Sequence, residues 1–151
     1  MPTLLVVHHT VSPATQELLE AALAGTRAEG LEGVDVVVRP ALAATPSDVL
    51  AADGFVLGTP ANIGYMSGAL KHFFDGIYYP TLTARPGAPY GVWAHGNNDT
   101  AGAIRAVESI AKGLGWQRVV TPVEVVGAVD AAAREAVWNL AATVAASLLD
   151  G

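Results

Sequence analysis

The sequence predicts a single α/β domain built around a parallel sheet of five strands. Short continuous apolar runs alternate with longer segments in which apolar residues recur every three or four positions. This alternation is typical of a parallel sheet that is covered by helices on both faces. The length of 151 residues suits one domain, and 52% hydrophobic against 15% charged residues indicates a large core.

Each of the five expected strands is followed by a helix, and no linker or internal repeat interrupts the series. The strands are expected at Leu4–Val7, Val34–Val38, Phe55–Leu57, Tyr90–Ala94 and Val119–Val126. The first two helices are expected at about Thr15–Glu29 and Pro46–Ala52, and the apolar faces of the other three run from Met66 to Ile77, from Ile104 to Leu114 and from Val137 to Leu148. Thr45 before Pro46 is a plausible N-cap for the second helix, and Gly115 closes the fourth.

Residues that disfavour the middle of a sheet indicate its two edges. Pro122 within the fifth strand predicts one edge, because proline cannot donate a ladder hydrogen bond. Asp35 and Arg39 in the second strand predict the other edge. With right-handed crossovers, these positions favour the strand order 2-1-3-4-5 with helices on both faces.

Charge and composition exclude several classes of function. The net charge is −6 and no two Lys or Arg residues are adjacent, which argues against nucleic-acid binding. Without cysteine, the chain has no disulfide, no thiolate nucleophile and no Cys-based metal site. The first residues do not resemble a signal peptide, and no apolar run reaches the roughly 18 residues of a membrane span. We therefore expect a cytoplasmic protein that does not bind membranes, and redox chemistry in it needs a bound cofactor.

Three loops are expected to form one crevice at the carboxyl ends of the strands. In a sheet of this order, ligands bind at the switch point between the first and third strands. The loops that can line this point are 8–15, 58–65 and 95–102. All three are rich in small, hydroxyl, amide and glycine residues, which expose donors to an anion or a heterocycle. The sequence therefore predicts a ligand site here.

Loop 8–15 precedes a helix N-terminus, where free N–H groups and the positive end of the helix dipole attract an anion. Thr10, Ser12 and Thr15 add hydroxyl donors, and the loop has no lysine or arginine. A phosphate held by neutral donors is one interpretation. The other is that Ser12 or Thr15 only caps the helix.

The stretch Thr10-Val11-Ser12-Pro13-Ala14-Thr15 resembles the phosphate loop of flavodoxins, Thr/Ser-x-Thr-Gly-x-Thr. In that family the hydroxyls and amides of the loop bind the phosphate of FMN. The resemblance implies a phosphate-binding role for Thr10, Ser12, Ala14 and Thr15. Pro13 replaces the glycine of the motif, which removes one N–H group and fixes the local φ angle.

A second and more specific resemblance covers residues 53–75, including Gly58-Thr59-Pro60 and Gly64-Tyr65-Met66-Ser67-Gly68-Ala69-Leu70-Lys71. This block is similar to one found in NAD(P)H:quinone oxidoreductases of the tryptophan-repressor-binding-protein type and in NADPH-dependent FMN reductases. It implies a flavodoxin-like fold, FMN as the cofactor and NAD(P)H as the electron donor. In those proteins the loop wraps the isoalloxazine ring, a role that would fall here to Pro60, Ala61, Asn62, Ile63 and Gly64.

The same resemblance places the third loop beside the flavin's pyrimidine side or ribityl chain. The residues concerned are His95, Gly96, Asn97 and Asn98. A solvated turn explains this composition equally well, because glycine, asparagine and aspartate are the usual turn residues. Tyr65 either covers the ring or packs against the protein.

Other sites are less consistent with the sequence. His8 and His9 point to opposite faces if they extend a strand, and no nearby carboxylate completes a ligand set, so we expect no metal site. Gly64-Tyr65-Met66-Ser67-Gly68 has the wrong spacing for a nucleophile elbow. Phosphate-binding and dinucleotide-binding glycine motifs are missing.

The sequence therefore predicts an FMN-binding oxidoreductase that passes reducing equivalents from NAD(P)H to a quinone or similar acceptor. The flavin carries this chemistry, so no catalytic side chain is expected. One alternative is a flavodoxin-type one-electron carrier. Another is a regulatory or binding protein of the same fold without a cofactor, which the proline at position 13 favours. The expected partner is a small-molecule acceptor or a redox protein, and a homodimer is possible.

Overall fold

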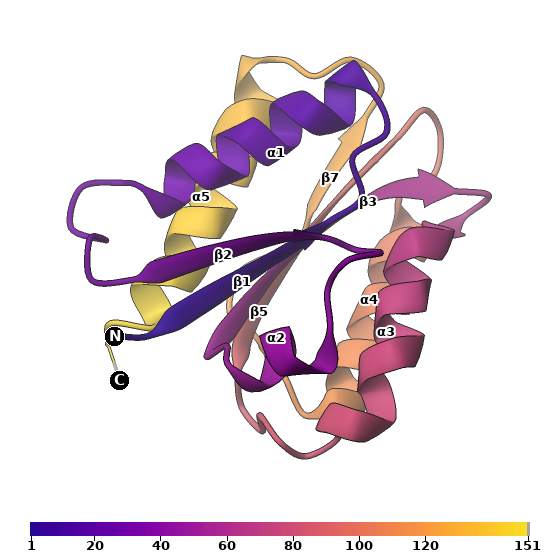
Figure 1. Ribbon diagram of the computed structural model, residues 1–151. Helices are drawn as coiled ribbons and strands as arrows, with labels where there is room; N and C mark the ends of the chain where they lie inside the picture. Colours follow the sequence, from indigo (N-terminus) through magenta and orange to yellow (C-terminus); the bar gives the residue numbers. More distant parts are fainter. Residues whose placement is uncertain (151) are drawn as a thin grey trace.

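A twisted, mainly parallel sheet runs through the middle of the structure, a computed structural model that describes residues 1–150 (Figure 1). Its strands are β1 (Thr3–His8), β2 (Asp35–Pro40), β3 (Gly54–Asn62), β4 (Tyr65–Met66), β5 (Pro89–Gly96), β6 (Gln117–Arg118) and β7 (Val123–Val126). The order is β2-β1-β3-β5-β6, with β7 also paired to β5 and the short β4 paired to β3. The predicted order is confirmed, with β5 as the fourth strand and β6 and β7 together as the fifth.

Helices cover both faces of the sheet. They are α1 (Pro13–Thr26), α2 (Pro46–Leu50), α3 (Gly68–Thr81), α4 (Ala101–Leu114) and α5 (Ala131–Ser147). Helices α1 and α5 lie on one face, and α2, α3 and α4 lie on the other (Figure 1). Side chains of β1 alternate between the two cores: Leu4 and Val6 face α1 and α5, while Leu5 and Val7 face the other three helices.

The predicted fifth strand, Val119–Val126, is wrong as a continuous element. The structure has the short strand β6 just before this range and β7 at its end, and residues 119–122 separate them. Pro122 lies in this break, where its missing N–H group costs no ladder bond. Both short strands still pair with β5 at the end of the sheet, so this edge is where the proline placed it.

The third strand is longer than the predicted Phe55–Leu57 and includes much of the expected loop 58–65. Strand β3 continues to Asn62 and turns back into β4, with Ala61 opposite Met66 and Asn62 opposite Tyr65. The turn residues Ile63 and Gly64 have φ angles of 50° and 71°. Positive φ at both positions is the geometry of a tight hairpin turn. We call residues 61–66 the β3–β4 hairpin.

Two further boundaries differ from the expectation. Strand β5 reaches Gly96, so His95 and Gly96 are strand residues rather than loop residues. Helix α1 spans Pro13–Thr26 instead of Thr15–Glu29, because Ser12 is its N-cap and Pro13 occupies the first helical position. The loop between β1 and α1 is therefore only four residues long, 9–12.

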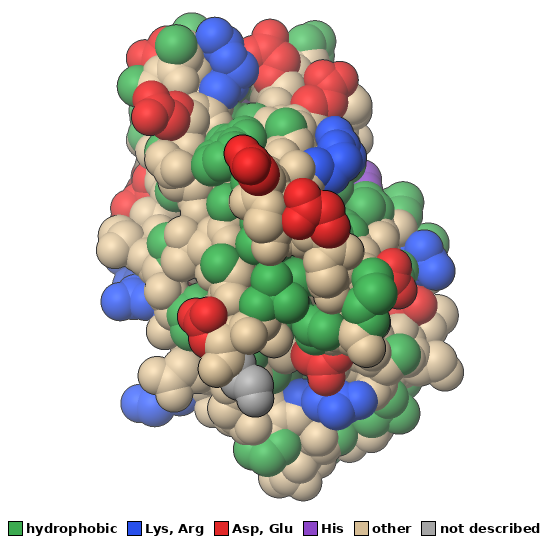
Figure 2. Space-filling view, turned by 90° about the vertical axis from the view of Figure 1, so that its left-hand side faces the viewer, with side chains coloured by type: hydrophobic (Ala, Val, Ile, Leu, Met, Phe, Trp, Pro, Cys, Tyr) green, Lys and Arg blue, Asp and Glu red, His purple; other side chains and the backbone are tan. Residues whose placement is uncertain are grey.

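The predicted edge position of the second strand is confirmed. Strand β2 pairs with β1 alone, and Asp35 and Arg39 are exposed. Figure 2 shows the face that carries the two chain ends, where Lys and Arg side chains stand singly among acidic and hydrophobic ones. No basic patch forms on this face, in keeping with the net charge of −6. None of the helices within residues 1–150 is both long and apolar enough to cross a membrane.

Candidate functional site

A cleft of about 560 Å³ opens at the carboxyl ends of β1, β3, β5 and β7. We call it the main cleft. It is lined by Ser12, Pro13, Ala14, Pro60, Ala61, Asn62, His95, Gly96, Asn97, Gly127 and Ala128. Its volume falls within the roughly 300–1,000 Å³ of small-molecule sites. The structure thus brings the three predicted loops together around one cavity, as the strand order requires.

Five of the predicted site residues lie outside the lining of the main cleft: Thr10, Thr15, Ile63, Gly64 and Asn98. Of these, Ile63, Gly64 and Asn98 line a smaller cleft of about 250 Å³. Ala61, Asn97 and Asp99 complete its lining. Because Ala61 and Asn97 line both cavities, the two clefts adjoin. Tyr65 is 41% exposed and lines neither of them.

Sequence reasoning missed Gly127 and Ala128, which follow β7. The Gly127 N–H donates to the Gly96 carbonyl at 2.8 Å, and the Gly127 carbonyl lies 2.7 Å from Nε2 of His95. These contacts attach the loop after β7 to the end of β5. The sequence could have indicated them, because the carboxyl ends of all parallel strands meet at one edge of the sheet. The loop after the last expected strand therefore also lies at this edge.

The hydrogen bond of His95 indicates which of its ring nitrogens carries a proton. A carbonyl oxygen only accepts, so Nε2 of His95 carries the proton that is donated to Gly127. In the neutral ring, Nδ1 is then an acceptor. His95 is partly exposed and lines the main cleft, so this ring offers an acceptor to a ligand there.

The hydroxyl groups of loop 8–15 cap helix α1. Oγ of Ser12 accepts the Thr15 N–H at 3.2 Å, and Oγ1 of Thr15 accepts the N–H groups of Val11 at 3.0 Å and Ser12 at 2.9 Å. Thr15 is only 3% exposed, and its hydroxyl lies 3.1 Å from the Ser12 carbonyl and 3.0 Å from the Ser12 hydroxyl. The capping interpretation is confirmed. Phosphate binding by these hydroxyls stays a prediction.

His8 is the last residue of β1, and His9 is the first residue of this loop. Nδ1 of His8 is hydrogen-bonded to Oγ1 of Thr10 at 2.8 Å, so the predicted donor Thr10 already has a partner. The His9 N–H donates to the Gly58 carbonyl at 3.0 Å, while Nδ1 of His9 is buried without a protein partner among the described residues. Burial, and secondly the neighbouring His9, lower the pKa of His8 below its ordinary value of 6.5.

Acidification should destabilise the protein through His8. The unfolded chain binds a proton at His8 more tightly than the folded protein does. Protonation therefore does not reduce the free energy of unfolding above about pH 6.5, and it reduces this free energy progressively as the pH falls below that value. His8→Asn keeps a polar atom near Thr10 without the titration. We expect its melting temperature to fall less than that of the wild type between about pH 7.5 and 5.5. Equal falls in the two proteins would contradict this assignment.

Buried hydroxyl groups hold the β3–β4 hairpin in place. Oγ1 of Thr59 accepts the Ser67 N–H at 3.0 Å and donates to the Pro60 carbonyl at 2.8 Å. Oγ of Ser67 accepts the Leu70 N–H at 3.1 Å and so caps α3. Both side chains are almost completely buried. Thr59 and Ser67 belong to the block 53–75 that resembles the reductases. They therefore position the hairpin that lines the site, and they do not line it themselves.

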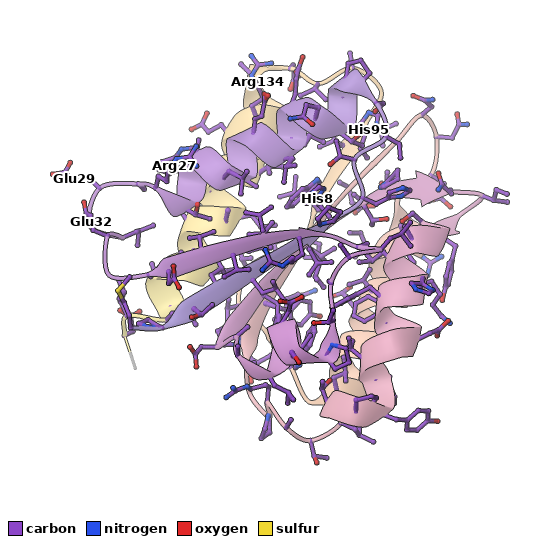
Figure 3. The ribbon with its side chains drawn as sticks, viewed as in Figure 1. His8, Arg27, Glu29, Glu32, His95 and Arg134 are labelled. Atoms are coloured by element: carbon purple, nitrogen blue, oxygen red, sulfur yellow. The ribbon has the colours of Figure 1, made fainter. Side chains whose placement is uncertain are left out.

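The main cleft is uncharged. None of its eleven lining residues is Lys, Arg, Asp or Glu, and Asp99 is the charged residue among those lining the smaller cleft. In Figure 3, His95 lies at the cleft, whereas Arg134 lies beside α1, where it is 3.6 Å from Glu17. The groups that the main cleft offers to a ligand are therefore backbone groups, amides, one imidazole and apolar contacts.

Comparison with known proteins agrees with this arrangement. The family model described as NADPH-dependent FMN reductase matches residues 9–134. A flavodoxin of Aquifex aeolicus (strain VF5) is 38% identical over 77 residues, which are 51% of this chain. The match spans 40% of the length of that relative.

Solved structures show the same fold at low identity. A flavodoxin from the domain Archaea has a TM-score of 0.83 at 14% identity, over 97% of this chain and 99% of its own. The flavodoxin, WrbA-like protein from Agrobacterium tumefaciens has a TM-score of 0.80 at 17% identity, over 99% of both chains. These likenesses establish the flavodoxin-like fold. Since the family model covers most of the sequence, the chain belongs to the NADPH-dependent FMN reductase family.

Proposed function

We propose that this chain binds FMN in the main cleft and passes reducing equivalents from NAD(P)H to a quinone or similar acceptor. The observation that carries the proposal is the uncharged cleft of about 560 Å³ at the carboxyl ends of the strands, in a chain of this family. Bound flavin would supply the ability to take up a hydride and to release its two electrons. NAD(P)H gives up a hydride, which carries two electrons and one proton, and one further proton from water completes the conversion of a quinone to a hydroquinone.

The residues of the main cleft suit an isoalloxazine ring. Pro60, Ala61 and Gly96 offer small, apolar surfaces for a flat heterocycle. A Cβ atom on Gly96 would lie 3.2 Å from Cβ of Ala61 and 3.3 Å from Cγ2 of Thr100, so a side chain there would crowd its neighbours. Asn62, Asn97 and His95 supply the donors and acceptors that the edge of such a ring requires.

The rim of the cleft favours a second candidate, a one-electron carrier that docks on a protein partner. Ile63 at the tip of the β3–β4 hairpin is fully exposed, and Val11 of the first loop is 59% exposed. Exposed apolar side chains beside a binding site are typical of protein contact surfaces. A carrier with this rim would exchange electrons with its partner and not with NAD(P)H.

Anaerobic reduction separates these functions. The protein is incubated with FMN, and unbound flavin is removed by gel filtration. The complex is then mixed with NADH or NADPH while the visible absorbance of the flavin is followed. We expect bleaching faster than for free FMN and recovery of the colour on addition of a benzoquinone. A flavin that only dithionite reduces would instead favour the carrier. A protein that takes up no flavin would contradict both functions.

A further inference from the structure

We propose that the site recognises a flavin through its ring system and not through its phosphate, so that riboflavin binds about as tightly as FMN. The inference rests on the proposed function, because it concerns a flavin in the main cleft. It makes FMN an exchangeable ligand and extends the ligand class to unphosphorylated flavins. Three features of the N-terminus of α1 support it: the backbone donors that are still free, the hydroxyl groups and the charges nearby.

Most of the backbone donors around this helix end are engaged within the protein. Pro13 at the first helical position has no N–H group. The Thr15 N–H donates to Oγ of Ser12, and the Gln16 N–H donates to the Ser12 carbonyl at 3.0 Å. The Val11 and Ser12 N–H groups both donate to Oγ1 of Thr15. The N–H groups of Thr10 and Ala14 have no partner among the described residues, and of these two residues Ala14 lines the main cleft, whereas an anion site at a helix end normally presents several donors.

The hydroxyl groups are engaged in the same way. Oγ1 of Thr15 accepts two N–H groups and is buried beneath the loop, so a ligand in the main cleft does not reach it. Oγ1 of Thr10 is bonded to Nδ1 of His8, and Thr10 does not line the cleft. Ser12 does line the cleft, and its hydroxyl proton is the second donor that the cleft lining leaves for a phosphate, after the Ala14 N–H group. Two neutral donors that replace water at an open rim contribute little net affinity.

No cation compensates for the missing donors. The main cleft contains neither lysine nor arginine. Arg134 lies 3.6 Å from Glu17, and its guanidinium donates to the Val129 carbonyl at 3.5 Å (Figure 3). The net charge of −6 acts against a phosphate dianion at longer range. The phosphate of FMN therefore remains in water beside Ser12 and Ala14.

Parallel titrations of riboflavin and FMN test the inference. The fluorescence of each flavin is measured as the full chain is added in phosphate-free buffer, and the two dissociation constants are compared. We expect a ratio below about tenfold, which is the effect of one modest interaction. A larger preference for FMN would overturn the inference and leave the proposed function standing. Binding of neither flavin would overturn the proposed function as well.

Variants of the loop before α1 separate an effect on phosphate binding from an effect on stability. Ser12→Ala and Thr15→Val remove capping hydrogen bonds, so both should lower the melting temperature, and Ser12→Thr should restore it at position 12. Their ratio of FMN to riboflavin affinity should stay within a few-fold of that of the wild type, because Thr15 does not reach the phosphate and the single neutral donor of Ser12 contributes little net affinity. A variant that weakens FMN binding more than tenfold while it leaves riboflavin binding unchanged would show that the loop holds the phosphate.

Discussion

Gly102→Ala should displace the β3–β4 hairpin and weaken flavin binding at least tenfold. Gly102 is buried in the first turn of α4, against the turn of the hairpin. A Cβ atom at this position would lie 1.9 Å from the carbonyl oxygen of Gly64 and 2.9 Å from its carbonyl carbon. Both contacts are to backbone, so either the hairpin or the helix must move. Overpacking of this kind typically costs about 1–3 kcal/mol.

The hairpin carries Ala61 and Asn62, which line the main cleft, so its displacement reshapes the site. Gly76→Ala is the matched control, because Gly76 is an exposed residue of α3 where an added Cβ atom would meet nothing within 4 Å. Alanine in a helix interior normally gains up to about 1 kcal/mol over glycine. Chemical denaturation and flavin titration compare the two variants. If Gly102→Ala gained stability and bound flavin normally, α4 would not position the hairpin.

Phe55→Ala should lower the free energy of unfolding by about 3–5 kcal/mol, the usual cost of removing a buried phenyl ring. Phe55 in β3 is fully buried and stacks on Trp116, with ring centroids 3.9 Å apart and planes 11° from parallel. Phe74 and Tyr90 flank Trp116 with centroids at 6.3 Å each. The substitution therefore opens a cavity inside an aromatic cluster that joins β3, β5 and α3.

Tyr79→Ala is the control for this substitution, because Tyr79 is 81% exposed on α3. A surface change of this kind should stay within about 0.5 kcal/mol. Urea denaturation of the two variants and the wild type gives the comparison. A cost for Phe55→Ala close to that of Tyr79→Ala would contradict the packing of the sheet against α3 and the segment after α4.

Most of the fold could be predicted because burial on both faces makes the central strands apolar runs. Leu4–Val7 and Tyr90–Ala94 are almost completely buried, and the edge strand β2 carries the exposed Asp35 and Arg39. The end of β3 could not be predicted in this way. Gly58-Thr59-Pro60-Ala61-Asn62 has the composition of a loop, and its strand conformation depends on pairing with β5, where Thr59 lies opposite Ala94.

Pro60 illustrates how the tertiary context overrides local preference. The Gly58 carbonyl accepts the His9 N–H, so Gly58 directs its backbone groups toward β1. By alternation, the nitrogen of Pro60 faces the same side, and the paired part of β1 has ended opposite Gly58. Its missing N–H group therefore breaks no ladder bond. Proline in a sequence usually indicates a loop, but at position 60 it is compatible with a strand.

The location of the site could be predicted from the sequence, but the role of each side chain in it could not. The rule that ligands bind beyond the carboxyl ends of the strands identified the three loops, and eight of the predicted residues line the main cleft. Composition does not distinguish a hydroxyl that binds a ligand from one that caps a helix, because serine and threonine suit both roles. The hydrogen bonds around Ser12 and Thr15 are needed to tell them apart.

Flavin titration of a blocked cleft tests the central claim most directly. Asn97 is exposed and lines both clefts, so Asn97→Trp fills the site without disturbing the core, and Asn139→Trp on the exposed face of α5 is the control. The quenching of FMN fluorescence is measured for both variants and the wild type. We expect saturable binding by the wild type and Asn139→Trp, and a loss of at least tenfold in affinity for Asn97→Trp. Undiminished binding by Asn97→Trp, or none by the wild type, would contradict a flavin site in the main cleft.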